Sequence, residues 1–594
     1  MKPTKSTKRR TSTILVVVLL GVCLVVYKLI DIQVVSAGAL AAQAAAARGS
    51  VDTIYAPRGD IVADDGTVLA GSVLRYDFQA DPSHTADFQL TDSAGHATTV
   101  TVAQALEELA NATGGSAARF QAAITAALKA NPDSLYALLY SNADVAAYNR
   151  VIALKIPWVH ATSHPGRVYP DGAVAGNIIG YLNAQGVGVE GLESAYQQCL
   201  AGVDGKESYQ YGADGVVIPG STQVTKAAKP GGTLVTTLDA DLNWFANQQL
   251  VDQVAKTGAE FGQIAVIDTK TGAIKASAQY PSVDPNNVDG TPAAYRSTAM
   301  MFSSQFEPGS IFKAISAAAM IDSGYATPSS RVIAPYAFTA PGGVLVHDAE
   351  GHGDSRLTLT GILMNSSNTG ISSLGANMDP MVRYAYYQKF GIGTATGVDF
   401  PAESSGVLTN PSTWSPQTKF STLFGQGVSA TQAQMLDAYQ ALANGGVRIP
   451  LTLVKGCRQA DGAVTDAPKP KPVRVVSKKS AQTVLDMLES IVQQGPYRNT
   501  LRMAGYRYSA KTGTAQEPNP NGSGYFAGKY YVSVMGVTTT DDPRYVISVN
   551  LGYPTTNRTS AAAIPLFKIM VQQVLKTFHI APSSSVPTMY QPYW

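Results

Sequence analysis

The sequence carries little charge and few of the residues that bind metals. Charged residues make up 14% of the 594 positions, well below the roughly 25% of an average soluble chain, and the net charge is only +2. Without a basic excess to neutralise a phosphate backbone, the composition argues against a nucleic acid as partner. The seven histidines and three cysteines form no H-E-x-x-H or C-x-x-C pattern. We therefore expect no metal and no cofactor.

Cysteine is too scarce for a disulfide scaffold. Cys23 lies inside an apolar run, where we expect an ordinary membrane-buried side chain. Cys199 and Cys457 fall in what we predict to be different domains, so a bridge between them remains an open question at this stage.

The chain has a single long apolar run, which follows a positive cluster. Residues 1–10 contain five Lys or Arg and no acid, and residues 14–30 are apolar except for Gly21 and Lys28. This length fits a helix that spans a hydrocarbon core, which takes about 20 residues. We predict a cytoplasmic tail at 1–10, a transmembrane helix at 11–33 and an extracytoplasmic remainder. The alternative is a cleaved signal peptide, because small-residue patterns typical of cleavage sites occur at 39–44.

The remainder of the chain changes pattern near residue 230. Residues 34–230 mix short strand-like runs with Ala-rich helical segments such as 102–111 and 117–130. After the turn at 229–232 the pattern predicts a strand at 234–238, a helix at 241–257 and a hairpin of 263–268 with 273–279. We place one domain at 34–230, a second at 231–582 and a Pro/Ser-rich tail at 583–594.

A candidate nucleophile lies at a predicted helix start. Residues 307–313 read E-P-G-S-I-F-K and lead into an Ala-rich run, so Pro and Gly mark the beginning of the helix. Ser310 and Lys313 are three residues apart and share one helical face. Apolar neighbours would desolvate the Lys313 amine and lower its pKa. Such an amine can take the proton of a nearby hydroxyl and make it a nucleophile. The competing interpretation is a surface lysine beside a serine cap.

Two more motifs follow in an informative order. Ser366 and Asn368 form S-x-N, and Lys511 opens K-T-G. Each motif alone is weak, since K-T-G recurs at 256–258 and 270–272 and S-x-N recurs at 548–550. Only the series from Ser310 through Ser366 to Lys511 has the order found in serine acyl-transferring enzymes of the penicillin-recognising type.

Beyond these motifs, the chain resembles class B penicillin-binding proteins over nearly its whole length. Residues 56–61 (A-P-R-G-D-I) and 66–70 (G-T-V-L-A) are similar to the membrane-proximal pattern of that family. Further similar stretches are R-V-Y-P at 167–170, G-Y at 180–181, G-V-E-G at 188–191, Y-P-S-V-D-P-N at 280–286, G-Q-G-V-S-A-T at 425–431 and N-G-G at 444–446. The middle motif ends in Asn368, which resembles division-type, FtsI-like transpeptidases more than the elongation type, where Asp is common.

The resemblance implies an α+β fold in three parts. These are a single N-terminal transmembrane helix, an elongated β-rich pedestal of the dimerisation type, and a penicillin-binding transpeptidase domain whose antiparallel sheet is flanked by helices. It places the chain in the bacterial plasma membrane with its catalytic domain outside.

The resemblance also implies roles for the first two motifs. Ser310 would attack the D-Ala–D-Ala bond of a peptidoglycan stem peptide, with Lys313 as the base. Ser366 would relay protons to the leaving amine, and Asn368 would hold the donor's amide. The implied activity is D,D-transpeptidation during septal cell-wall synthesis.

The third motif would bind substrate. Lys511 would place positive charge near the substrate carboxylate, and Thr512, Gly513 and Thr514 would line the strand beside it. Backbone N–H groups of Ser310 and Thr514 would hold the oxyanion. The implied partners are stem peptides, β-lactams, a membrane glycan polymerase of the FtsW type and other division proteins.

Several alternatives share these motifs. An elongation-type transpeptidase or a D,D-carboxypeptidase would use the same acyl-enzyme, and a non-catalytic division scaffold would use only the anchor and pedestal. A serine β-lactamase would need a deacylating base, for which Glu403 is the candidate, but an anchor and a large pedestal argue against it.

Five charged residues are expected to form structural ion pairs. For Arg58, Asp60 and Glu190 we expect salt bridges that fix the pedestal to the catalytic domain. We expect the same kind of role for Arg296 and Glu307.

Overall fold

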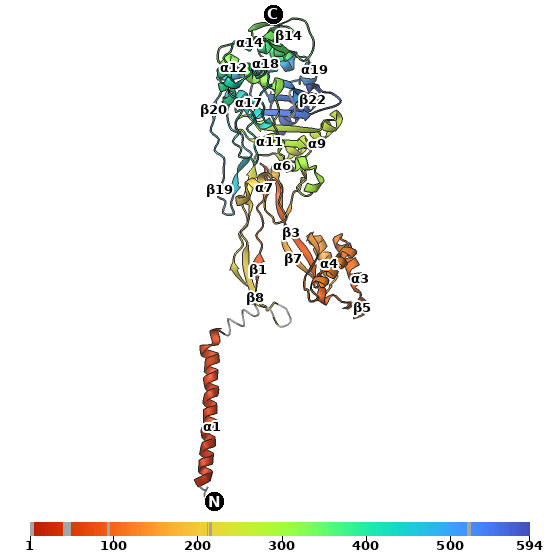
Figure 1. Cartoon of the computed structure of the whole chain (residues 1–594), viewed down its shortest axis with the longest axis vertical. Coiled ribbons are helices and arrows are strands. Elements are labelled where there is room, and N and C mark those ends of the chain that lie inside the picture. Colours follow the sequence, from red (N-terminus) through yellow and green to blue (C-terminus); the bar gives the residue numbers. More distant parts are fainter. Residues whose placement is uncertain (1–4, 40–48, 92–94, 211, 213–216, 520–523) are drawn as a thin grey trace. The chain divides into compact units, whose positions relative to one another are not determined.

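The computed structural model describes residues 5–39, 49–91, 95–210, 212, 217–519 and 524–594 (Figure 1). It divides into two compact units, residues 1–57 with 202–230 and residues 58–201 with 231–594. Residues 1–4 of the predicted cytoplasmic tail and residues 40–44 of the candidate cleavage sites lie outside the described residues.

The first unit contains the apolar helix and a small sheet. Helix α1 (Lys5–Ile30) continues into a short π-helical turn, η1 (Asp31–Val35). The segment Arg9–Val35 is long and apolar enough to cross a membrane, and none of its most apolar window is buried in the protein. A helix that exposes apolar side chains all round needs a lipid or protein surface to cover it. Strands β1 (Gly49–Ile54), β8 (Gly205–Gln210) and β9 (Gln223–Lys226) form an antiparallel sheet in the order β1-β8-β9.

The second unit contains a seven-stranded sheet built from two parts of the chain. Its order is β19-β18-β10-β2-β3-β6, with β7 also paired to β3. Only β2 and β10 run parallel, with Ile61 opposite Leu234. Strands from both sides of residue 230 therefore share one sheet. Its strands are β2 (Ile61–Val62), β3 (Val68–Ala80), β6 (Ala137–Ala143), β7 (Val159–Val168), β10 (Thr233–Thr236), β18 (Val454–Arg458) and β19 (Val464–Thr465).

Three helices pack against the β3–β6–β7 end of this sheet. They are α3 (Val102–Thr113), α4 (Ala117–Ala130) and α5 (Val145–Ala153). A Thr101–Gln104 capping box starts α3, and the left-handed Gly114 ends it, as these residue types favour. Phe78, Leu109 and Trp158 are among the buried side chains of this small core. Short elements complete the region: η2 (Pro82–His84), β4 (Phe88–Thr91), β5 (Ala97–Val100), α6 (Gly176–Ile179), α7 (Gly191–Ala195) and α8 (Gln197–Leu200).

The ion pairs formed by Arg58 and its neighbours differ from those expected. The fully buried Glu193 accepts from Arg58 Nε at 2.6 Å and from Arg167 Nε at 2.7 Å. Among the described residues, Asp60 and Glu190 form no ion pair, so the expectation for these two acids is wrong. Folding brings Glu193, and not Asp60 or Glu190, to the guanidinium of Arg58. Glu193, Arg58 and Arg167 all precede residue 230. The bridge therefore stabilises residues 58–201 internally.

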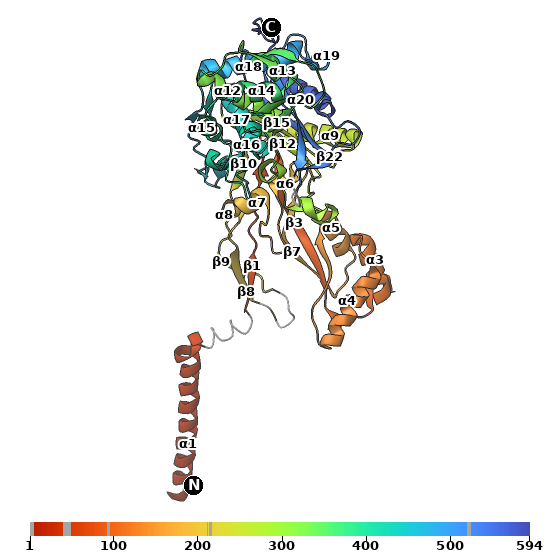
Figure 2. The ribbon, with the colours of Figure 1, turned by 45° about the horizontal axis from the view of Figure 1, so that its top comes forward.

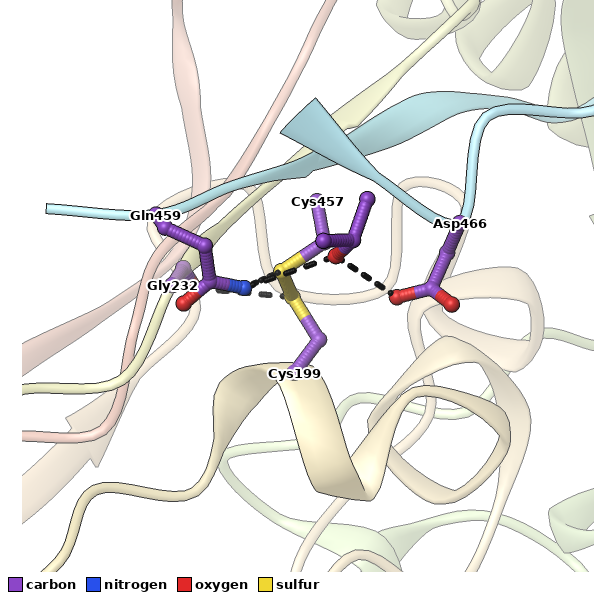
Figure 3. Close-up of a disulfide and its surroundings, with 6 residues drawn as sticks. Cys199, Gly232, Cys457, Gln459 and Asp466 are labelled. Atoms are coloured by element: carbon purple, nitrogen blue, oxygen red, sulfur yellow. Dashed lines mark hydrogen bonds between the residues drawn. A yellow bond between two sulfur atoms is a disulfide. The ribbon is translucent and has the colours of Figure 1, made fainter. Parts of the chain in front are cut away.

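A disulfide joins distant parts of the second unit. Cys199 in α8 bonds to Cys457 in β18, across 258 residues of sequence (Figure 3). The amide of Gln459 lies against the Cys457 sulfur, and the side chain of Asp466 lies on the far side of the bridge. The open question from the sequence is thus answered in favour of a bridge.

Replacing both bridged cysteines, Cys199→Ser with Cys457→Ser, is expected to lower the free energy of unfolding by about 2–4 kcal/mol, because the bridge restricts the unfolded chain. Chemical unfolding of the detergent-solubilised chain measures this. Cys23→Ser is the matched control, since Cys23 is a free cysteine. A double variant as stable as the control would contradict the prediction.

A five-stranded antiparallel sheet forms the centre of the C-terminal part of the chain (Figure 2). Its order is β12-β11-β23-β22-β21, which leaves β21 at one edge. Alternate residues of β11 enter two different cores: Ile264 and Val266 face one, Ala265 and Ile267 the other, as the two-residue period of a strand requires. The strands are β11 (Phe261–Asp268), β12 (Ile274–Tyr280), β21 (Tyr508–Pro518), β22 (Tyr525–Thr538) and β23 (Tyr545–Gly552).

Helices cover both faces of this sheet. Helices α9 (Ala240–Thr257) and α20 (Ile564–Thr577) contribute to one core. Helices α12 (Lys313–Asp322), α17 (Gln432–Ala443) and α18 (Lys478–Gln494) contribute to the other (Figure 2). Every residue of α17 is buried, so it is the central helix of its layer. The mixed architecture confirms the predicted α+β class.

The remaining short elements surround these layers. The helical ones are η3 (Val288–Gly290), α10 (Ala293–Arg296), α11 (Met300–Ser303), η4 (Gly309–Phe312), α13 (Leu359–Asn365), α14 (Asn368–Gly375), α15 (Pro380–Lys389), η5 (Pro411–Thr413), α16 (Pro416–Ser421), α19 (Arg498–Leu501) and η6 (Ser560–Ala562). The strands are β13 (Arg331–Ala334), β14 (Ala337–Ala340), β15 (Val344–His347), β16 (Ser355–Thr358), β17 (Val447–Arg448) and β20 (Val473–Arg474).

Candidate active site

The candidate nucleophile lies in a tight turn before a buried helix. Ser310 belongs to the 3₁₀ turn η4, which leads directly into α12. Gly309 has φ 55°, a left-handed conformation that favours glycine. A Cβ at Gly309 would meet the Cβ of Ala515 at 3.2 Å, so the turn packs closely on strand β21. The half-buried Ser310 is therefore held beside the strand that carries K-T-G.

Lys313 is the centre of a hydrogen-bond network. Its Nζ lies 2.9 Å from Ser310 Oγ and 2.7 Å from Asn368 Oδ1, and it also donates to the backbone oxygen of Ser366. The side chain is fully buried. Burial lowers the pKa of Lys313 to about 7, and the nearby Asp348 carboxylate opposes that shift.

The S-x-N motif joins two helices. Helix α13 ends at Asn365, and Ser366 takes a left-handed conformation, φ 57° and ψ 31°. Ser367 then caps α14 by accepting from Gly370 N. This sharp turn aims Ser366 and Asn368 at the same place, which explains why the two motif residues both contact Lys313.

The K-T-G motif lies on an edge strand. Lys511 in β21 is 1% exposed and donates to Ser366 Oγ at 2.9 Å. Burial, followed by repulsion from Lys313, lowers the pKa of Lys511 well below its ordinary value. A Cβ at Gly513 would lie 2.4 Å from Ser533 Oγ and 3.3 Å from the Pro308 oxygen, so a larger residue here would displace the Ser533 side chain and crowd the turn before Ser310. Among the described strands β21 pairs with β22 alone, which leaves one backbone edge for an extended peptide.

The structure thus joins five predicted site residues through hydrogen bonds: Ser310, Lys313, Ser366, Asn368 and Lys511. Thr512, Gly513 and Thr514 follow along the edge strand, with Thr514 exposed. The competing motifs lie in other elements. Residues 256–258 end α9 with a left-handed Gly258, 270–272 form the β11–β12 turn, and 548–550 lie in β23.

The network determines what Lys313 can do with a proton. An ammonium has three N–H donors and no acceptor. Four oxygens surround this one, three of them close and the fourth, Ser366 Oγ, at 3.4 Å. A neutral amine keeps two donors and gains a lone pair. If Ser366 O and Asn368 Oδ1 take the two donors, the lone pair points at the Ser310 hydroxyl. The arrangement can therefore deprotonate a serine near neutral pH.

The contacts of Glu307 differ from expectation. Glu307 accepts from Gly427 N at 2.7 Å and from Tyr525 Oη at 3.0 Å, and in the described part of the chain it has no basic partner. Its expected ion pair is wrong, because burial raises the pKa of Glu307 and neutral donors satisfy its oxygens. Arg296 does pair, with Asp289 at 2.8 Å. Glu403 accepts from Thr396 and holds its own loop.

Sequence reasoning missed Asp348, which packs under the S-x-N turn. Its carboxylate accepts from the backbone N–H of Asn368 and of Thr369. No motif marks Asp348 in the sequence, since it follows the β14–β15 hairpin and reaches the site only through tertiary folding. In the described ranges no three His, Cys, Asp or Glu side chains gather as metal ligands would.

Comparison with known protein families defines the class of this fold and site. The model of the penicillin-binding protein transpeptidase domain matches residues 262–572, and that of the penicillin-binding protein dimerisation domain matches residues 53–236. The first match contains all three motifs. The chain belongs to the penicillin-binding protein transpeptidase family.

Individual relatives cover almost the whole chain. The penicillin-binding protein PbpB of Mycobacterium tuberculosis is 35% identical over 94% of this chain and 83% of its own length. The peptidoglycan D,D-transpeptidase FtsI of Escherichia coli is 29% identical over 96% of this chain and 91% of its own. A structure of penicillin-binding protein 3 from M. tuberculosis complexed with aztreonam superposes with a TM-score of 0.68, at 30% identity, over 91% of this chain and 100% of that one. The predicted family and enzyme class are confirmed.

Proposed function

We propose that this chain is a peptidoglycan D,D-transpeptidase that cross-links stem peptides through an acyl-enzyme on Ser310. The observation that carries the proposal is the three-way contact of Lys313 with Ser310 Oγ, Ser366 O and Asn368 Oδ1. Those contacts leave the amine's lone pair for the hydroxyl proton of Ser310. A lysine with a pKa of about 7 is well matched to that task at neutral pH.

In the acylation step, Ser310 Oγ attacks the carbonyl carbon of the penultimate D-Ala while Lys313 takes its proton. The carbonyl oxygen becomes an oxyanion, held by the backbone N–H groups of Ser310 and Thr514, each donor contributing roughly 3–4 kcal/mol. The C–N bond to the terminal D-Ala then breaks. The leaving amine receives a proton through Ser366, whose hydroxyl lies between Lys313 and Lys511.

Substrate binding would use Asn368 and the edge strand β21. Asn368 would hold the donor's amide, and the extended donor would lie along Thr512, Gly513 and Thr514. Lys511 would face the terminal carboxylate of the donor. An anion beside a buried amine favours its charged form, so substrate binding would oppose the effect of burial on the pKa of Lys511.

In the transfer step, an amine from a second stem peptide attacks the Ser310 ester. As the new amide forms, the attacking amine gives up a proton to Lys313, which became neutral again when the first leaving group was protonated. The ester C–O bond breaks, and Lys313 passes that proton to Ser310 Oγ. A β-lactam would react by the same first step, since opening its ring amide leaves the acyl group on Ser310. The M. tuberculosis structures complexed with aztreonam and with ampicillin support β-lactams as ligands of this site. Neither step needs a metal or cofactor.

The proposal includes a single-pass anchor. Helix α1 would span the plasma membrane with its basic N-terminal side in the cytoplasm. The Cys199–Cys457 disulfide supports an extracytoplasmic remainder, because disulfides persist in oxidising compartments. The proposed division between pedestal and catalytic domain at residue 230 has support from family matches at 53–236 and 262–572.

The proposal assigns the enzyme to septal synthesis, because the middle motif ends in Asn368 as in FtsI-like enzymes. An FtsW-type glycan polymerase and other division proteins are the proposed partners. An elongation role and a purely structural division role are the alternatives.

A product assay separates these activities. The detergent-solubilised chain is incubated with a stem pentapeptide donor and an amine acceptor, and products are identified by mass. A transpeptidase releases D-Ala and forms the donor–acceptor amide. A D,D-carboxypeptidase gives the shortened tetrapeptide alone, and a scaffold leaves the donor intact. Either of the last two outcomes would contradict the proposal.

A further inference from the structure

The Asp348 carboxylate accepts hydrogen bonds from the S-x-N turn. The residue follows β15 and is 7% exposed. Its Oδ1 accepts from Asn368 N at 2.5 Å and from Thr369 N at 3.0 Å, and its Oδ2 accepts from Ser367 Oγ at 2.8 Å. One carboxylate therefore satisfies the first backbone donors of α14, where negative charge is favoured.

His352 pairs with the same carboxylate. Its Nε2 lies 2.9 Å from Asp348 Oδ2, and its Nδ1 lies 2.6 Å from the Gly353 oxygen. Both ring nitrogens face oxygens that can only accept, and only the imidazolium form donates from both. The Gly353 bond and the Asp348 bond raise the pKa of His352 in the same sense. The charged groups acting on the ring are Asp348 and Asp354.

One aromatic contact completes the surroundings of His352. The ring of Tyr336, which precedes β14, meets the His352 ring edge-on at 6.2 Å between centroids. Tyr336 also lies 6.1 Å from the ring of His347. The ring of Tyr336 supplies no proton acceptor for His352, so the negative charges that act on His352 are the carboxylates of Asp348 and Asp354.

The pair reaches the candidate catalytic lysine through Asn368. The Asn368 side chain donates from Nδ2 to the His347 oxygen at 3.2 Å and accepts at Oδ1 from Lys313. Its backbone is fixed by Asp348. The Asp348 charge also acts on Lys313 directly, opposing the effect of burial.

We propose that Asp348 and His352 form a positioning pair that holds Asn368, and through it Lys313, in the geometry needed for acylation. The inference rests on the proposed function of Lys313 and adds two residues to it. Asp348 fixes the turn, while His352 sets how much of the Asp348 charge reaches Lys313.

The two residues have opposite electrostatic effects on Lys313. Asp348→Asn removes a negative charge, so Lys313 loses its proton more easily and the acid limb of the acylation profile moves to lower pH. His352→Gln removes a positive charge that offsets Asp348, so the acid limb moves to higher pH. A structural defect alone would lower the rate in both variants without shifting the limbs in opposite directions.

Two measurements test the pair. The first is the pH profile of acylation by a fluorescent penicillin for wild type, Asp348→Asn and His352→Gln. The second is hydrogen–deuterium exchange at residues 365–371, which needs no activity. Asp379→Asn is the matched control, because Asp379 caps α15 by accepting from Met381 N and, in the described part of the chain, accepts no hydrogen bond from a site residue.

We expect Asp348→Asn to lower the acylation rate about tenfold or more, the consequence of unmade buried hydrogen bonds, and to speed exchange of the Asn368 and Thr369 amides. The Asp379→Asn control should change neither. Unchanged exchange in folded Asp348→Asn, or wild-type acid limbs in both variants, would overturn the inference. If Asp348→Asn does not fold, the pH profile of His352→Gln tests the inference. An acid limb at higher pH than in wild type supports it, and a wild-type acid limb overturns it. If wild type is not acylated, the proposed function fails, and exchange still decides whether Asp348 holds the turn.

Discussion

A Ser310→Ala variant is expected to fold normally and to form no covalent adduct with a fluorescent penicillin. The reason is chemical: alanine has no oxygen with which to form the ester, and the remaining site can only bind the β-lactam reversibly. In membranes exposed to the probe, wild type should give a labelled band near 62.3 kDa that is absent in the variant. Melting curves of the two proteins check the fold.

Ser323→Ala is the matched control for this experiment. Ser323 is an exposed serine at the end of α12 that donates to the Met320 oxygen, and its loss should leave labelling intact. A band that persists in Ser310→Ala would show that another serine is the nucleophile. The absence of a band in wild type would favour a silent scaffold or an enzyme that needs its partner.

A Lys313→Arg variant is expected to lose about 10²–10⁴-fold in acylation rate, the usual contribution of a positioned general base. Arginine keeps the positive charge but cannot give up its proton in a protein, so it cannot take the proton of Ser310. Stopped-flow measurement of β-lactam acylation gives the rate. Lys275→Arg is the matched control. Lys275 lies on β12 and pairs with Asp64, and among the described residues it forms no hydrogen bond or ion pair with the site.

The wild-type pH profile tests the same role without a mutation. The pKa of Lys313 is lowered to about 7, so its amine is neutral above that pH and protonated below it. The acylation rate should therefore rise through about pH 7 and level off above it. A rate that is flat across this range, or Lys313→Arg acylating like wild type, would contradict the role of Lys313 as base.

Local sequence signals predicted much of this molecule. The Pro-Gly start of the helix and the three-residue spacing predicted the Ser310–Lys313 contact, which forms at 2.9 Å. The Ala-rich segment at 117–130 is helix α4, and the hairpin predicted around residues 269–272 is β11–β12. Motif order separated the K-T-G at 511 from its competitors. These features depend on residues close in sequence, or on a series whose order can be read directly.

Long-range polar contacts could not be predicted in the same way. Glu193 forms salt bridges with both Arg58 and Arg167, although the G-V-E-G stretch had indicated Glu190 as the acid. Asp348 reaches α14 across about twenty residues through a hairpin with no distinctive pattern. Which acid meets which base depends on how sheets and turns pack, and a difference of a few residues in sequence changes the partner. The same reason applies to Glu307, whose carboxylate accepts from the backbone N–H of Gly427 and the hydroxyl of Tyr525 instead of pairing with a cation.

Peptide mapping by mass spectrometry of the wild-type chain after reaction with a β-lactam tests the central claim most directly. We expect a single acylated peptide, with the added mass on Ser310, formed faster above about pH 7 than below it. An adduct on any other residue, or an acylated Ser310 whose formation does not depend on pH across this range, would contradict the Ser310–Lys313 mechanism.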